Sequence, residues 1–198
     1  MQQNQRYIVL SWKKNYEHLI KLSKKVKESK FKPNIIVGIS RGGLIPSRII
    51  SDILDNPNLA TIRVEFYKYS KKKLKEPEIT QPISTPIDGK KILLIDDVAD
   101  SGKSLQLVYE HLLKKAKEIR TLTIFYKPWS CLLPDYYLKE TEAWIIFPWE
   151  YYETVKWIVK KNIDEGRTLE KTKNDLTKMG FDSSIIERFV RELWNAVI

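Results

Sequence analysis

Three acidic residues directly after an apolar stretch form the most specific chemical pattern in the sequence. Residues 92–95 predict a buried strand, and Asp96, Asp97 and Asp100 follow it. A Ser-Gly turn and a helical pattern come next, and the first amide groups of a helix bind anions because they lack partners within the helix. Carboxylates beside a phosphate site bind a divalent cation or sugar hydroxyls. The segment therefore predicts a site for a phosphorylated sugar.

Two other interpretations of this acidic segment can be weighed on the sequence. The triplet Gly102-Lys103-Ser104 matches the end of a nucleoside triphosphate P-loop, but that motif requires its first glycine at position 97, where this chain has Asp97. The P-loop interpretation is therefore excluded. A capped helix that follows an ordinary solvated acidic turn remains the structural alternative.

A second glycine-containing turn, Arg41-Gly42-Gly43, follows another predicted strand at residues 35–39. Glycines let backbone amides approach an anion closely, and an arginine grips a diphosphate through two parallel hydrogen bonds. Taken alone, the turn is also typical of any tight connection between a strand and a helix. Together with the acidic segment, it predicts a second anion subsite.

The spacing of apolar residues predicts the elements that position these turns. A helical pattern begins after Ser11 and ends near Pro33. Short apolar runs predict five strands, at residues 35–39, 61–66, 92–95, 122–126 and 144–147. Strands that alternate with helices predict an α/β fold, with a five-stranded, mostly parallel sheet and flanking helices.

Two segments depart from this alternation. Residues 68–90 are long for a connection and carry a lysine run, three prolines and a glycine, so we expect a functional lid there. Helical patterns at residues 150–164, 168–179 and 183–197 predict a C-terminal three-helix bundle. We therefore expect two domains, a core at residues 1–149 and a helical appendage at residues 150–198.

Charge and composition limit the partners. The 198 residues carry a net charge of +10, and the first 150 hold 26 Lys and Arg against 17 Asp and Glu. A basic field attracts phosphates of any kind. The polar N-terminus, the single cysteine Cys131 and the lack of a long apolar stretch predict a cytoplasmic protein without membrane contact.

The two turns, at their distance in the chain, resemble the type I phosphoribosyltransferase family, which uses 5-phosphoribosyl-1-pyrophosphate (PRPP) with Mg²⁺. The resemblance implies that Asp96 and Asp97 hold the ribose hydroxyls and the metal, and that Asp100 acts at N7 of a purine. It implies a 5′-phosphate loop formed by Ser101, Gly102, Lys103 and Ser104. It implies pyrophosphate contacts from Ser40, Arg41 and Gly42, often with a cis peptide between Ser40 and Arg41, and from the lid residues Tyr69, Ser70, Lys71 and Lys72.

Residues 123–128, 134–137 and 143–150 are similar to the 6-oxopurine branch of that family, especially the xanthine-guanine enzymes. By this resemblance Lys127 donates to the purine 6-oxygen, Trp144 stacks on the base as the main part of a nucleobase-binding hood, and Ile145 lies at the base edge. Ile146 and Phe147 stand where that branch has acidic and amide residues.

The C-terminal helical extension resembles an archaeal branch that acts on adenine, although Lys127 has no acceptor to meet on the 6-amino group. We expect a homodimeric adenine phosphoribosyltransferase of purine salvage, which converts adenine and PRPP to AMP and pyrophosphate. A hypoxanthine, guanine or xanthine enzyme is the alternative. A PRPP-sensing regulator that binds nucleic acid is a third hypothesis, which the lack of a recognition-helix or RNA-reading pattern disfavours.

Overall fold

The computed structural model describes residues 6–68 and 75–197 and divides the chain into two compact units. The first unit contains the described residues up to Asn15 and those from Glu142 onward, and the second unit is Tyr16–Thr141. Each unit has a hydrophobic core of its own. The division of the chain at residue 149 stays a prediction.

The second unit is built on a five-stranded sheet with the strand order β4-β3-β2-β5-β7. Every neighbouring pair is parallel except β3 and β4, which are antiparallel. The strands are β2 (Ile35–Ser40), β3 (Leu59–Lys68), β4 (Lys75–Gln81), β5 (Lys91–Ile95) and β7 (Glu118–Leu122). The predicted α/β fold class is confirmed.

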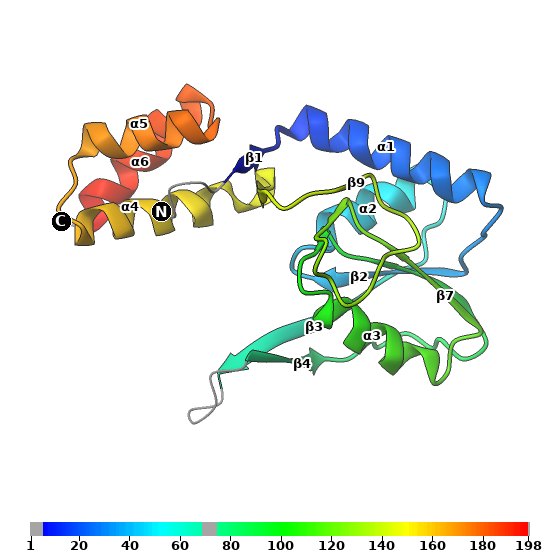
Figure 1. Cartoon of the computed structure of the whole chain (residues 1–198). Helices are drawn as coiled ribbons and strands as arrows, with labels where there is room; N and C mark the ends of the chain where they lie inside the picture. Colours follow the sequence, from blue (N-terminus) through cyan, green and yellow to red (C-terminus); the bar gives the residue numbers. More distant parts are fainter. Residues whose placement is uncertain (1–5, 69–74, 198) are drawn as a thin grey trace. The chain divides into compact units, whose positions relative to one another are not determined.

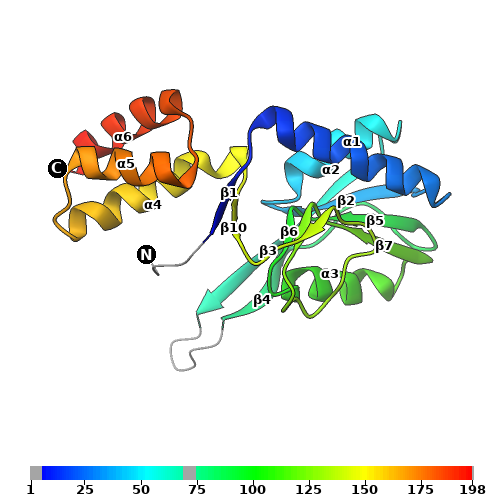
Figure 2. The same cartoon turned by 45° about the horizontal axis from the view of Figure 1, so that its top comes forward.

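Helices cover both faces of this sheet. Figures 1 and 2 show α1 (Trp12–Glu28) and α2 (Leu44–Ile53) on one face and α3 (Lys103–Leu113) on the other. The central strands β2 and β5 are buried almost throughout, as expected for strands that are covered on both faces. Their apolar runs made these two strands predictable from the sequence.

The connections place a topological switch point between β2 and β5. The chain leaves β2 through α2 to reach β3, and it leaves β5 through α3 to reach β7 on the other side of the sheet. Sheets of this kind bind ligands outside the carboxyl ends of the two strands where the order reverses. The register pairs Gly38 with Ile95, so the two predicted turns begin side by side there.

One strand differs from the prediction. Residues 144–147 are absent from the main sheet, and its fifth strand is β4, within the segment expected to be a lid. Pro77 is tolerated in β4 because this strand lies at the sheet edge. The lid residues Tyr69, Ser70, Lys71 and Lys72 lie outside the described residues.

A small three-stranded sheet follows the main one in the second unit. Its order is β6-β8-β9, formed by Val98–Ala99, Phe125–Tyr126 and Lys139–Glu140. The predicted strand at residues 122–126 is therefore divided between the end of β7 and β8. This small sheet fixes the chain on either side of Lys127.

The first unit pairs the start of the chain with its last quarter. Strand β1 (Tyr7–Val9) is parallel to β10 (Trp144–Ile146), and a short 3-10 helix, η1 (Pro148–Glu150), follows. The predicted three-helix bundle is confirmed as α4 (Tyr151–Asp164), α5 (Leu169–Met179) and α6 (Ser183–Val197). Across residues 6–68 and 75–197, no helix has the length and apolar character needed to cross a membrane.

Candidate active site

A cavity of about 210 Å³ lies at the carboxyl end of β5. The start of α3 forms part of its wall, so helix amide groups border it. Its lining includes five residues predicted for the site, Asp96, Asp100, Ser101, Gly102 and Ser104. It also includes Phe66, Val98, Ala99 and Leu105, which the sequence did not single out. The cavity is the place where the predicted phosphate loop and acidic residues meet.

Gly102 needs to be glycine for two reasons. Its φ of 75° is left-handed, a conformation that other residues rarely adopt. A β-carbon there would also lie 2.4 Å from Ser130 Oγ and 2.9 Å from Leu132 N. The Cys131 amide donates to the Ser101 carbonyl at 3.0 Å. The segment after Lys127 therefore packs directly against the phosphate loop.

The two adjacent carboxylates have different surroundings. Asp96 lines the cavity, and its Oδ1 accepts a hydrogen bond from the Asp97 amide at 3.0 Å. Asp97 is only 6% exposed, and its Oδ1 accepts from the Val98 amide at 2.7 Å. A β-carbon on Gly42 would lie 2.5 Å from both Asp97 carboxylate oxygens. Asp97 thus packs against the Arg-Gly-Gly turn, which brings the two predicted motifs into contact.

The Arg-Gly-Gly turn connects β2 to α2. The peptide between Ser40 and Arg41 is cis, as the family resemblance implied. Arg41 is exposed beyond the end of β2, and Gly43 is the residue that precedes α2. The turn therefore presents an arginine beside the acidic pair.

The acidic pair fits a metal that arrives with its substrate. Within the described residues, no group of three or more His, Cys, Asp and Glu side chains is arranged to hold a metal ion. Mg²⁺ commonly binds through one or two carboxylates together with substrate phosphates and water. Asp96, which faces the cavity, is the better placed of the two carboxylates for this role.

The side chain of Lys103 is engaged in an ion pair with the edge strand β4. Its Nζ donates to both carboxylate oxygens of Glu76 on β4, at 3.0 and 3.2 Å. This ion pair ties the start of α3 to the edge strand. The expected phosphate contact of Lys103 stays a prediction.

Lys127 is only 5% exposed, and it follows β8 in the second unit. Its amide donates to the Ala99 carbonyl at 3.0 Å, and its Nζ lies 5.7 Å from the centre of the Trp129 ring. Trp129 Nε1 in turn donates to Asp100 Oδ1 at 3.0 Å. Lys127 and Asp100, 27 positions apart in the sequence, therefore contact the same indole ring.

The tyrosine before Lys127 stays neutral. Tyr126 donates a hydrogen bond to Glu140, and this bond, with a smaller contribution from desolvation, raises the pKa of Tyr126 to about 12. Its phenol therefore adds no negative charge beside the Lys127 ammonium at any ordinary working pH.

Trp144 and Ile145, the predicted hood residues, belong to the first unit. Both lie on β10, where Trp144 is 51% exposed and Ile145 is buried. An exposed tryptophan on a strand presents a flat apolar surface to solvent. Its predicted stacking on a base stays a prediction.

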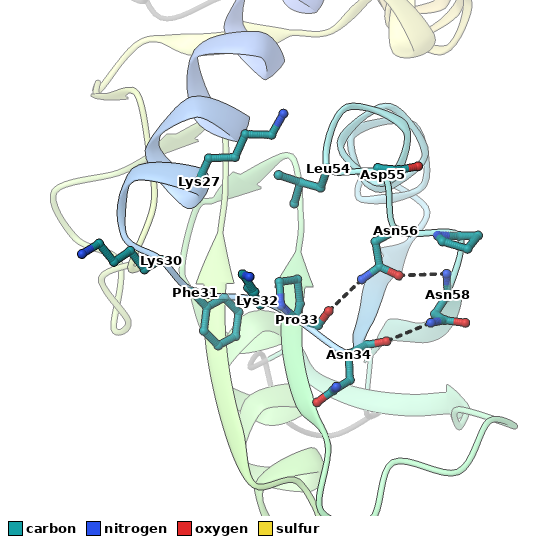
Figure 3. A pocket seen from close by; sticks show the side chains of 11 residues that line it. Lys27, Lys30, Phe31, Lys32, Pro33, Asn34, Leu54, Asp55, Asn56 and Asn58 are labelled. Atoms are coloured by element: carbon teal, nitrogen blue, oxygen red, sulfur yellow. Dashed lines mark hydrogen bonds between the residues drawn. The ribbon is translucent and has the colours of Figure 1, made fainter.

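A second hollow, of about 510 Å³, lies at the opposite end of the strands, before the starts of β2 and β3. Figure 3 shows it between the ends of α1 and α2, with lysines at its border. Its asparagines are engaged by the protein itself, since Asn56 Nδ2 donates to the Pro33 carbonyl at 2.8 Å and Asn58 Nδ2 donates to the Asn34 carbonyl at 3.2 Å. The cavity at the carboxyl end of β5 is therefore the better candidate site.

An anion-binding helix start beside carboxylates, at the switch point of a parallel sheet, is typical of proteins that bind a phosphorylated sugar. Comparisons with known proteins agree with this class. Residues 7–155 match the phosphoribosyl transferase domain. The chain is 36% identical over 119 residues to the xanthine-guanine phosphoribosyltransferase of Cereibacter sphaeroides, a match that covers 58% of this chain and 68% of that protein.

Solved structures show the same similarity. The purine phosphoribosyltransferase of Pyrococcus horikoshii is 41% identical with a TM-score of 0.65, over 72% of this chain and 93% of that one. The xanthine-guanine-hypoxanthine phosphoribosyltransferase of Helicobacter pylori is 27% identical with a TM-score of 0.65, over 73% and 94%. The chain therefore belongs to the type I phosphoribosyltransferase family, in the branch of the xanthine-guanine and purine enzymes.

Proposed function

We propose that the protein transfers the 5-phosphoribosyl group of PRPP to N9 of a 6-oxopurine, such as guanine, hypoxanthine or xanthine, with release of pyrophosphate. The comparisons favour this alternative over adenine, which the C-terminal extension favoured at the level of the sequence. The family match ends at residue 155. The structural alignments cover 93% and 94% of the two solved chains but only 72% and 73% of this chain. These relatives therefore give no reason to link the C-terminal extension to adenine.

The observation that carries the proposal is the pairing of Lys127 and Asp100 across one indole. It places an ammonium donor and a carboxylate acceptor at the same indole ring. One edge of a 6-oxopurine presents the matching pair, an oxygen acceptor at position 6 and an N–H donor at N7. Adenine presents an amino donor at position 6, which cannot accept from an ammonium.

In the reaction, N9 forms a bond to the ribose carbon as the bond to pyrophosphate breaks. Asp100 takes the N7 proton, which leaves N9 the better nucleophile. The departing pyrophosphate leaves positive charge on the ribose ring and carries negative charge itself. The Asp96 carboxylate stabilises the positive charge on the ribose, and Arg41 stabilises the negative charge on the pyrophosphate. Mg²⁺, held through Asp96 with a contribution from Asp97, would neutralise the pyrophosphate.

Substitution of Lys127 by methionine tests the choice of base. Methionine keeps the length and apolar stem of this buried side chain but removes the donor, so kcat/KM for guanine and hypoxanthine is expected to fall by about 10- to 50-fold. Adenine should lose less than about threefold. Steady-state kinetics with the four purines measures both ratios.

Lys161→Met is the matched control, because Lys161 Nζ lies 5.3 Å from the centre of the Trp157 ring in the first unit. It should leave every kinetic constant unchanged. A wild-type kcat/KM higher for adenine than for any 6-oxopurine would contradict the proposal. Nucleic-acid binding without purine-dependent pyrophosphate release would instead support the regulator hypothesis, and the expected homodimer stays a prediction.

A further inference from the structure

Trp129 has no role in the reaction described so far, yet it contacts both groups proposed to recognise the base. Its Nε1 donates to Asp100 Oδ1 at 3.0 Å, and its ring lies beneath the Lys127 ammonium. An indole is a bicyclic aromatic with an N–H in its five-membered ring, as is a purine in its N7–H form. Trp129 thus offers Asp100 the same kind of donor that the N7–H of a purine would offer.

The side chain of Trp129 can move without disturbing the loop that carries it. It is 56% exposed, so it is not locked in the core of the unit. The backbone of the loop is fixed by three hydrogen bonds, from the amides of Lys127, Ser130 and Cys131 to the carbonyls of Ala99, Lys127 and Ser101. A rotation of one side chain is therefore enough to release Asp100.

We propose that Trp129 is an internal competitor of the purine, which occupies the Asp100 carboxylate in the free enzyme and is displaced when N7–H of the base binds there. This inference rests on the proposed function, because it requires Asp100 to receive the base. The apparent affinity for the base is then the intrinsic affinity multiplied by the fraction of molecules in which Asp100 is released. It also makes Trp129 a specificity-determining residue, since a base without a donor at N7 leaves the indole in place.

Trp129→Phe removes the N–H donor and keeps an aromatic face for Lys127. The KM for guanine is expected to fall by about three- to tenfold, the scale of one exposed hydrogen bond to a charged group, with kcat and the KM for PRPP within about twofold. Trp157→Phe is the matched control, because Trp157 is similarly exposed (59%) and also lies beneath a lysine. It should change none of these constants.

A residue that merely holds Asp100 in position would give the opposite result, because its removal would raise the KM for guanine or lower kcat. Either of those changes, or an unchanged KM, overturns the inference. Trp129→Leu, which likewise has no donor for Asp100, should also lower the KM and serves as the second variant if the phenylalanine variant folds poorly. A wild-type enzyme without activity on any 6-oxopurine would instead overturn the proposed function, and this inference with it.

The indole N–H signal in ¹H–¹⁵N spectra provides a readout that a structural role would not move. Hypoxanthine can present a proton at N7, and ribose 5-phosphate carries no base, so we expect hypoxanthine to shift the Trp129 indole signal well beyond any shift caused by ribose 5-phosphate. The signal is assigned by its absence from the Trp129→Phe spectrum. An indole signal that stays in place while hypoxanthine binds would overturn the displacement and leave the proposed function standing.

Discussion

Asp100→Asn is expected to lower kcat by about 10²-fold or more, the usual scale of a lost general base. Asparagine keeps the shape of the side chain, and its carbonyl oxygen can still accept the Trp129 indole N–H that Asp100 Oδ1 accepts now. It cannot take the N7 proton of the base. The KM for PRPP should therefore stay within about threefold, as measured by steady-state release of pyrophosphate.

Asp88→Asn is a suitable control for this variant, because Asp88 is an exposed carboxylate that is not among the residues lining the cavity. It removes the same charge and should leave kcat unchanged. If Asp100→Asn retained kcat within about threefold, Asp100 would only organise its loop, and another group would have to accept the proton.

Gly43→Ala is expected to cost about 3 kcal/mol or more of unfolding free energy. The backbone of Gly43, with φ −72° and ψ −9°, suits any residue, so conformation is no obstacle. Space is the obstacle, because the new β-carbon would lie 2.3 Å from the Ile95 carbonyl oxygen and 2.8 Å from Ile39 N and O. These atoms belong to the two central strands and cannot move without distorting the sheet.

Urea denaturation of the two variants Gly43→Ala and Gly89→Ala distinguishes the cost of a steric clash from the cost of an unfavourable backbone conformation. Gly89 has a φ of +67° and no atom within 4 Å of the added carbon, so its variant should lose about 1 kcal/mol from backbone strain alone. Recovery of Gly43→Ala only as insoluble protein would agree with the expectation. Equal stability of the two variants would show that the turn can widen freely.

The sequence predicted the parts of the fold whose signals are local. The buried runs of β2 and β5, the helix starts beside them and the three C-terminal helices all carry their own apolar periodicity. Strand β4, with the sequence KEPEITQ, has no such run because it is an edge strand that pairs with β3. Its strand character comes from that pairing, which no short window of sequence contains.

The strand at residues 144–146 shows the converse case. Its apolar character was visible, but its partner was not, and the structure pairs it with Tyr7–Val9 at the start of the chain. Local periodicity predicts that a segment is extended and leaves open which sheet it joins. The same limit explains why residues predicted as one strand at 122–126 are divided between two sheets.

Most of the candidate site was accessible from motifs, since the acidic segment and the Arg-Gly-Gly turn were both identified from the sequence and the structure brings Gly42 against Asp97. Trp129 was missed, because an exposed loop residue has no periodic pattern. The sequence feature that could have pointed to it is a bulky aromatic residue two positions after Lys127, in a segment predicted to contact the base. Its significance depends on a contact with Asp100, 29 residues away.

The contact between Gly42 and Asp97 also restricts the order in which this site could have changed during evolution. A side chain at position 42 and a carboxylate at position 97 would claim the same space, with 2.5 Å between their atoms. A lineage could therefore enlarge residue 42 only after residue 97 had become smaller, and that first step would already remove a buried acid from the sugar site. Residues 42 and 97 are therefore expected to vary together among relatives and not one at a time.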